Sequence, residues 1–375
     1  MIGMIGMIGT TLAVCILNLS AHALQSPPIY GDWRTYTTED GLPNNHIYWV
    51  EVDEVREDCI WLGTDEGLAC LHPSTGEVEH YTPKDGLAHQ AVMAIQVDPK
   101  TGDLWIATFG GLSWFSGGKF RTYTQDNSGL ASNVVFGVAI QGDTIWAATT
   151  AGASRFIPRT NSWMTYSSAN APFEENWSYN AAPGPPGKVF IAAWGGGILE
   201  YDVERDYWQA YKDPDKEFEI DLFPNDGLVH DIITAVSYED SVIWASTYFG
   251  LSIYDHWRRW NSYFEHDSGL ASEFINFVRA QPGTHIGWIC TDKGLSVFDY
   301  DTNRWVTYKP LDSHGHEGEV RIYEGGKLLE TFHQEPSIGN QFVLSVDFEG
   351  DDVVWVGTSH GVSRGVRQPE PLGMR

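Results

Sequence analysis

The chain has 375 residues, a formal net charge of −27 and an aromatic content of 13 %. This excess of carboxylates excludes a nucleic-acid-binding surface, because such a surface must neutralise phosphates. Hydrophobic residues make up 42 % and charged residues 19 %, which excludes a disordered acidic chain, and the 39 Gly and 18 Pro predict many tight turns and no long helix.

The first segment has the features of an export signal. Residues 1–31 contain no charged side chain, and an apolar stretch over 12–17 precedes Ala21-His22-Ala23, which fits the small-x-small pattern of signal peptidase sites. We therefore expect a signal peptide over 1–23, a linker over 24–31 and a mature protein in the periplasm or outside the cell. An uncleaved N-terminal anchor is the alternative. No later stretch is apolar enough to span a bilayer.

A short motif recurs seven times along the rest of the chain. In each copy an aromatic residue opens an apolar strand, a small residue follows two positions later, and a Gly comes after a short turn. The copies begin at Trp61, Trp105, Trp146, Phe190, Trp244, Trp288 and Trp355. A period of about 44 residues holds four short strands, which is typical of a propeller blade. The Gly supplies the positive φ of a tight hairpin, and we expect the small residue to face the neighbouring blade.

A second pattern, with Tyr three residues after a bulky residue, marks the outermost strand of each blade. Its first copy, Trp33/Tyr36, precedes the first Trp strand, and no copy follows the last Trp strand. The sequence therefore predicts an all-β fold, a single seven-bladed β-propeller over 32–367, with the N-terminal strand completing the last blade and leaving no open sheet edge. A hairpin over 313–339 is expected between blades six and seven, and a tail over 368–375.

The cysteines do not suggest a framework of disulfides. Cys15 lies in the leader, which leaves Cys59, Cys70 and Cys290. In the strand register that we infer, Cys70 lies opposite Trp61 and Cys59 opposite His72, a poor geometry for a disulfide. We therefore predict free thiols.

The repeats resemble those of the two-component regulator propeller family. The first copy, Trp61-Leu62-Gly63-Thr64 with Gly67-Leu68, carries the resemblance, as do the connectors Asp40-Gly41-Leu42 and Asp85-Gly86-Leu87. In that family such propellers form the extracytoplasmic sensing half of membrane histidine kinases, often responding to polysaccharide fragments. This chain has no kinase and no membrane span after the propeller, so the resemblance implies a stand-alone exported member that keeps only the binding role.

Candidate site residues lie on one predicted face of the propeller. We call it the connector face: it is built by the connectors that enter each innermost strand and by the turns after each second strand. Aromatic platforms beside amides and carboxylates suit sugar rings, whose C–H faces stack while their hydroxyls form hydrogen bonds. The predicted ligand-binding residues are Phe109, Asn176, Trp177, Trp194, Asp231, Tyr248, Phe249 and Glu273.

Three classes of function fit this face. A propeller that recognises a small-molecule or glycan ligand and a scaffold for an exported protein partner are both non-enzymatic, and we expect a monomer with no catalytic residue and no cofactor. The alternative is a metal-assisted lyase or hydrolase acting on a carbohydrate or cyclic ester, which would need groups such as His89, His230 and Asp231 from separate blades. The stretch His314-Gly315-His316-Glu317, with His333 beyond it, is interpreted as an acidic loop without a metal.

Overall fold

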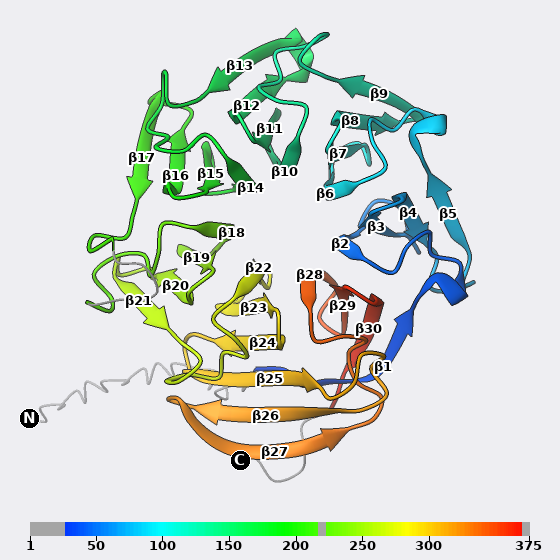
Figure 1. Ribbon diagram of the computed structural model, residues 1–375, viewed down its shortest axis with the longest axis vertical. Coiled ribbons are helices and arrows are strands. Elements are labelled where there is room, and N and C mark those ends of the chain that lie inside the picture. The colour runs from blue at the N-terminus through cyan, green and yellow to red at the C-terminus, as the bar shows by residue number, and fades with distance from the viewer. Residues whose placement is uncertain (1–26, 217–222, 370–375) are drawn as a thin grey trace, which may run out of the picture.

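The computed structural model describes residues 27–216 and 223–369, and the predicted signal peptide lies outside them. Seven antiparallel sheets form a ring, in the arrangement predicted from the repeats (Figure 1). The strands of blades one to three are β2 (Ile47–Val52), β3 (Ile60–Thr64), β4 (Gly67–Leu71), β5 (Val78–Tyr81), β6 (Val92–Val97), β7 (Leu104–Thr108), β8 (Gly111–Ser116), β9 (Lys119–Tyr123), β10 (Val135–Gln141), β11 (Thr144–Thr149), β12 (Gly152–Ile157) and β13 (Ser162–Tyr166).

Blades four to seven follow the same order from the centre outward. Their strands are β14 (Ser178–Pro183), β15 (Lys188–Ala193), β16 (Gly197–Asp202), β17 (Tyr207–Tyr211), β18 (Ile233–Glu239), β19 (Val242–Thr247), β20 (Leu251–Tyr254), β21 (Trp260–Tyr263), β22 (Ile275–Ala280), β23 (Ile286–Thr291), β24 (Gly294–Asp299), β25 (Arg304–Pro310), β26 (Gly318–Glu324), β27 (Lys327–Gln334), β28 (Val343–Glu349), β29 (Val353–Thr358), β30 (Gly361–Arg367) and β1 (Tyr30–Tyr36). The helices among the described residues are three single 3-10 turns, at Thr38–Asp40, Pro83–Asp85 and Pro158–Thr160, and none of them is long or apolar enough to cross a bilayer.

The two ends of the described chain close the ring. Strand β1 pairs with β30, so that Tyr36 lies opposite Val362 and Tyr30 opposite Arg367, and Figure 1 shows the two strands side by side. Trp33 and Tyr36 of β1 are 3 % and 2 % exposed, so the added strand also contributes to the core. The N-terminal strand thus completes blade seven, as the sequence predicts.

The small residue of the first motif, Gly63, lies where two blades approach closely. A Cβ at Gly63 would come within 2.7 Å of the carbonyl oxygen of Val92, which belongs to the innermost strand of blade two. The turn glycine meets a second restriction, because Gly111 has a φ of +138° and its Cβ would lie 2.4 Å from the carbonyl oxygen of Tyr123. Glycine at each of these two positions therefore avoids a contact between a Cβ and a backbone carbonyl oxygen.

The motif tryptophans fill the space between blades. Trp61 contacts Phe115 of blade two with ring centroids 6.1 Å apart, and Trp288 contacts Phe348 of blade seven at 5.5 Å. Both tryptophans are almost fully buried. Such rings bury roughly 150–250 Å² each, so this layer supplies much of the apolar area that holds the ring together.

The insertion after blade six widens that blade to six strands. Strands β26 and β27 continue the sheet outward from β25, at the rim of the ring (Figure 1). The hairpin is also tied to the closing strand: the Trp33 indole N–H donates to Gln334 Oε1 at 2.9 Å, and Gln334 Nε2 donates to the Tyr30 carbonyl at 2.8 Å. The insertion therefore reinforces the closure.

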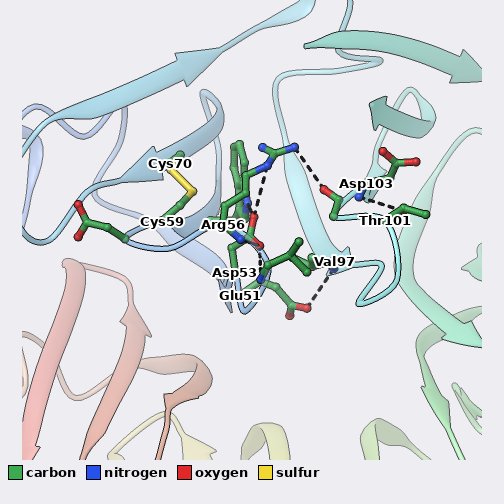
Figure 2. A network of polar contacts seen from close by, with 12 residues as sticks. Glu51, Asp53, Arg56, Cys59, Cys70, Val97, Thr101 and Asp103 are labelled. Carbon is green, nitrogen blue, oxygen red and sulfur yellow. Dashed lines mark hydrogen bonds and ion pairs between the residues drawn. A yellow bond between two sulfur atoms is a disulfide. The ribbon is translucent and has the colours of Figure 1, made fainter. Parts of the chain in front are cut away.

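The free-thiol prediction is wrong for two of the cysteines. Cys59 and Cys70 form a disulfide with their Cα atoms 5.7 Å apart, seen in Figure 2. The inferred pairing of Trp61 with Cys70 is confirmed. However, Asp58 has a φ of +60° and β3 begins only at Ile60, so the chain turns before Cys59 instead of continuing as a strand. Cys290 is free and buried, and burial raises the pKa of its thiol.

Candidate functional site

Each of the seven innermost strands carries a bulge at its second residue. The pairing with the next strand shifts there by one position, which leaves one residue per blade outside the ladder: Tyr48, Met93, Phe136, Tyr179, Thr234, Asn276 and Leu344. All seven are half-buried and stand between buried neighbours. A bulge redirects the extra side chain and often lies beside a functional site, so these residues, the bulge ring, define where the site can be sought.

Aromatic side chains join one side of the bulge ring into a continuous row. Ring centroids are 5.3 Å apart for Phe109 and Phe136, 5.1 Å for Phe136 and Tyr179, and 5.2 Å for Tyr179 and Trp194. The row continues from Trp194 to Tyr248 at 5.3 Å, and from Tyr248 to Phe274 at 4.2 Å. Trp177 lies against Phe136, Tyr179 and Trp194 at 5.9, 6.0 and 6.4 Å. The seven residues of this row, the aromatic belt, are Phe109, Phe136, Trp177, Tyr179, Trp194, Tyr248 and Phe274.

The belt is open to solvent and spans blades two to six. Phe109 is 36 % exposed, Trp177 44 % and Phe274 37 %, while its other four members are half-buried. Burial, followed by the neighbouring Tyr248 hydroxyl, raises the pKa of Tyr179, and burial raises that of Tyr248. Both phenols are therefore neutral near pH 7 and offer hydroxyls beside apolar ring faces.

Four of the eight residues predicted from the sequence belong to the belt: Phe109, Trp177, Trp194 and Tyr248. Two others hold connectors in place. Asn176 Oδ1 accepts the backbone N–H of Ser168 at 2.7 Å, and Asp231 Oδ1 accepts that of Asp213 at 2.8 Å. Asn45 does the same for Thr38 at 2.7 Å in blade one. A polar residue at this position therefore satisfies a backbone N–H at the start of its own connector, which leaves less of its side chain for a ligand.

Phe249 and Glu273 lie apart from the belt contacts. Phe249 packs on His230 with ring centroids 4.5 Å apart, and Glu273 lies 3.9 Å from His266. The histidines considered for an enzyme have local roles as well. Nδ1 of His230 accepts the backbone N–H of Ile232 at 2.9 Å, and His89 accepts that of Ala91 at 3.0 Å. Burial lowers the pKa of His230, so its ring is neutral near pH 7.

Two of the bulge residues outside the belt are polar. Thr234 Oγ1 donates to the Ile275 carbonyl and Asn276 Nδ2 to the Val343 carbonyl, each at 2.8 Å, so these bulge residues link consecutive blades. Two polar atoms of the connector face are buried without a hydrogen-bond partner among the described residues, His46 Nε2 and Asp292 Oδ1. Buried groups of this kind are rare in native structures, and a bound polar ligand is one way to satisfy them.

The far ends of the innermost strands form a different environment. A cavity of about 280 Å³ is lined there by residues that include Glu51, Val97, Arg279 and Asp347. Arg279 lies 2.9 Å from Asp347 and 3.6 Å from Glu51, and Figure 2 shows Glu51 accepting the Val97 N–H from blade two. Burial raises the pKa of Glu51 to about 7 against the opposing effect of Arg279, and burial also raises the pKa of Asp347.

Solved propellers share this architecture at low sequence identity. The extracellular domain of the hybrid two component system BT4673 from B. thetaiotaomicron aligns with a TM-score of 0.64 and 15 % identity, covering 91 % of this chain and 43 % of that one. The corresponding domain of BT3049 from the same organism gives 0.56 and 15 %, covering 92 % and 55 %. The chain thus spans about half the length of these two structures. A streptogramin B lyase aligns at 0.61 and 12 %, covering 92 % and 100 %.

These likenesses establish the fold. No family model matches the sequence, and no curated protein does. The structural neighbours thus include both extracellular domains of signalling proteins and an enzyme.

Sequence reasoning missed three members of the belt. Phe136 and Tyr179 are bulge residues, and Phe274 stands one residue before β22. The signal that would have found them is positional: each of the first two is the second residue of an innermost strand, and Phe274 occupies the place that Trp177 has before β14. An alignment of the seven repeats on the first residues of their innermost strands would therefore have added these three aromatic residues to the predicted site.

Proposed function

We propose that the protein is an exported recognition propeller whose aromatic belt binds a glycan-like ligand without turnover. The observation that carries the proposal is the belt itself, a row of seven aromatic rings in contact across five blades, with three members more than a third exposed. Exposed aromatic rows are costly to leave in water, and they mark binding surfaces.

The chemistry of the belt suits an uncharged, ring-shaped ligand. Indole and phenyl faces accept the C–H face of a sugar, while the neutral hydroxyls of Tyr179 and Tyr248 offer hydrogen bonds. A net charge of −27 repels anionic ligands over a Debye length of about 10 Å at 0.1 M salt. Neutral glycans are therefore favoured over acidic ones.

The neighbours support the biological setting of this proposal. The two B. thetaiotaomicron structures are extracellular domains of signalling proteins, and a recognition role outside the cytoplasm agrees with the expected signal peptide. We infer that the chain is a two-component regulator propeller that carries the sensing fold and works as a monomer. A protein loop rich in uncharged side chains is the second kind of ligand that the same surface accepts.

The test uses an array of neutral and acidic glycans, followed by calorimetry with any glycan that binds. Trp177→Ala and Trp194→Ala should each weaken binding by about 1–3 kcal/mol, which is roughly 5- to 150-fold in Kd. Trp257→Ala is the matched control, because Trp257 is 63 % exposed but lies in the turn between β20 and β21, at the other end of its blade.

Two outcomes would overturn the proposal. Binding that survives the combined loss of Trp177, Trp194 and Tyr248 would place the site away from the belt. Release of a product from the bound glycan, abolished by His230→Ala, would show an enzyme instead. Binding of a protein partner but of no glycan, lost in the same variants, would keep the belt as the site and replace the glycan by a protein loop.

A further inference from the structure

The loop between β25 and β26 gathers three side chains that ligate metals. The candidate ligand atoms of Asp312, His314 and His316 all lie within 4.8 Å of one another. His333 is not part of this group, and its Nε2 lies 3.9 Å from Glu317 and 3.9 Å from Glu335. The group in the structure therefore contains Asp312 in place of the Glu317 and His333 considered from the sequence.

Blade seven supplies a fourth candidate. His360, in the turn between β29 and β30, lies against His314 with ring centroids 4.8 Å apart and an interplanar angle of 78°. The two residues are 46 positions apart in the chain numbering and come from neighbouring blades. Three imidazoles and one carboxylate are thus available at one place on the connector face.

The loop is held in shape by its own backbone. Asp312 accepts the N–H groups of His314 at 2.7 Å and Glu317 at 2.9 Å, and the Leu311 N–H donates to the Glu317 carbonyl at 3.0 Å. The Asp312 carboxylate is therefore fixed at the centre of the loop, close to both histidines.

The loop is also docked on the connector that enters blade seven. The Ser337 N–H donates to the Gly315 carbonyl at 2.8 Å, and Asn340 Nδ2 donates to that of Ser313 at 3.2 Å. Gly315 has a φ of +72°, and a Cβ there would lie 2.7 Å from Gly339 Cα. Only glycine fits this contact, which sets the loop beside the turn that carries His360.

We propose that Asp312, His314, His316 and His360 bind a first-row transition metal dication such as Zn²⁺, which ties the blade-six insertion to blade seven. Imidazole nitrogens and one carboxylate oxygen are a ligand set that Zn²⁺ accepts in tetrahedral geometry, with ligand atoms about 3.3 Å apart. The proposal requires rotation of the imidazoles to that separation, and the side chains of His314 and His316 are exposed. Nδ1 of His314 lies 3.0 Å from Ser313 Oγ, which leaves Nε2 for the metal. Ca²⁺ and Mg²⁺ prefer six or more oxygen ligands and do not suit the site.

The experiment is a calorimetric titration of the protein, purified without a histidine tag, with Zn²⁺ alone and with Ca²⁺ alone. We expect saturable binding of one Zn²⁺, no binding of Ca²⁺, and a rise in Tm with Zn²⁺ because the metal binds only the folded state. His314→Ala, His316→Ala and His360→Ala should each weaken Zn²⁺ binding by about ten-fold or more. His333→Ala and His266→Ala are the controls and should change it less than about two-fold.

Absence of saturable Zn²⁺ binding up to about 1 mM would overturn the site, as would binding that survives the joint replacement of His314 and His316. Binding that is lost on replacement of those two but unchanged in His360→Ala would overturn the tie between the blades. Circular dichroism of each variant shows whether the fold is intact, and the Co²⁺-loaded protein provides a second readout, because strong visible absorption reports tetrahedral coordination.

Discussion

The two ends of the innermost strands carry different kinds of side chain on the same scaffold: exposed aromatic rings at one end and buried charges at the other. At the connector end, bulges turn out one side chain per blade, and the aromatic belt stays partly exposed. At the far end, Arg279 lies between Glu51 and Asp347, and the charges are buried against one another. Motif tryptophans such as Trp61 and Trp288 lie on the second strands and pack against the next blade. The comparison indicates that the repeated motif determines the packing of the blades. The residues at the strand ends vary between blades, and they form a binding surface at one end and a buried ion cluster at the other.

The largest difference between the two ends should appear in the free energy of unfolding when one side chain is replaced at each end, Arg279 at the far end and Trp177 at the connector end. Arg279→Met leaves two buried carboxylates without their cation, so we expect a loss of about 3–5 kcal/mol in the free energy of unfolding. Trp177→Ala removes an exposed ring and should cost about 1 kcal/mol or less. Urea denaturation of both variants measures the contrast. Equal losses would show that the belt is as structural as the ion cluster.

A second prediction concerns the pH dependence of the far end. Because the pKa of Glu51 is raised to about 7 in the folded protein, its protonated form is favoured by folding, and this stability is present below the ordinary pKa of 4.5 and is lost as the pH rises through 7. Each unit of that shift corresponds to about 1.4 kcal/mol. Glu51→Gln imitates the protonated form, so the variant should gain stability relative to the wild type between pH 4.5 and pH 7. Denaturation midpoints of both proteins at several pH values provide the measurement, and parallel pH profiles would contradict the prediction.

The smallest effect should come from the disulfide, which also belongs to the far side of blade one. Cys59 and Cys70 are 11 positions apart, and closing a loop of that length stabilises by roughly 2–3 kcal/mol through the entropy of the unfolded chain. Cys59→Ser with Cys70→Ser should lower the Tm, and reductant should affect the wild type but not the double variant. Cys290→Ser is the control, because that thiol is free. A wild type indifferent to reductant would show that the bond contributes little.

The sequence allowed the fold to be predicted because its constraints are local and repeated. A turn glycine such as Gly111 is required by a close approach of the backbone, and the same requirement recurs at the turn glycine of each blade. The absence of a Tyr pattern after the last Trp strand was enough to place β1 in blade seven.

The site was only partly predictable, for physical reasons. A one-residue bulge is invisible in a run of apolar residues, so Phe136 and Tyr179 were not among the predicted site residues. Asn176 was chosen for its chemistry, although its amide oxygen accepts a backbone N–H of its own connector. The approach of His360 to His314 depends on how two blades pack, which no spacing in the sequence contains. The disulfide was missed because the turn at Asp58 breaks the strand geometry assumed for Cys59.

The closing pair of strands also decides how the molecule responds to mechanical load. In the antiparallel pairing of β1 with β30, Tyr30 lies opposite Arg367, so both ends of the described chain leave the ring at the same corner. A force applied between them peels the ladder open one hydrogen bond at a time, because it acts across the strands and not along them. The hydrogen bonds from Trp33 to Gln334 and from Gln334 to Tyr30 lie at that corner and are loaded at the outset. Attachment through a single end leaves the pair unloaded, so the propeller tolerates being tethered by one terminus far better than being stretched between two.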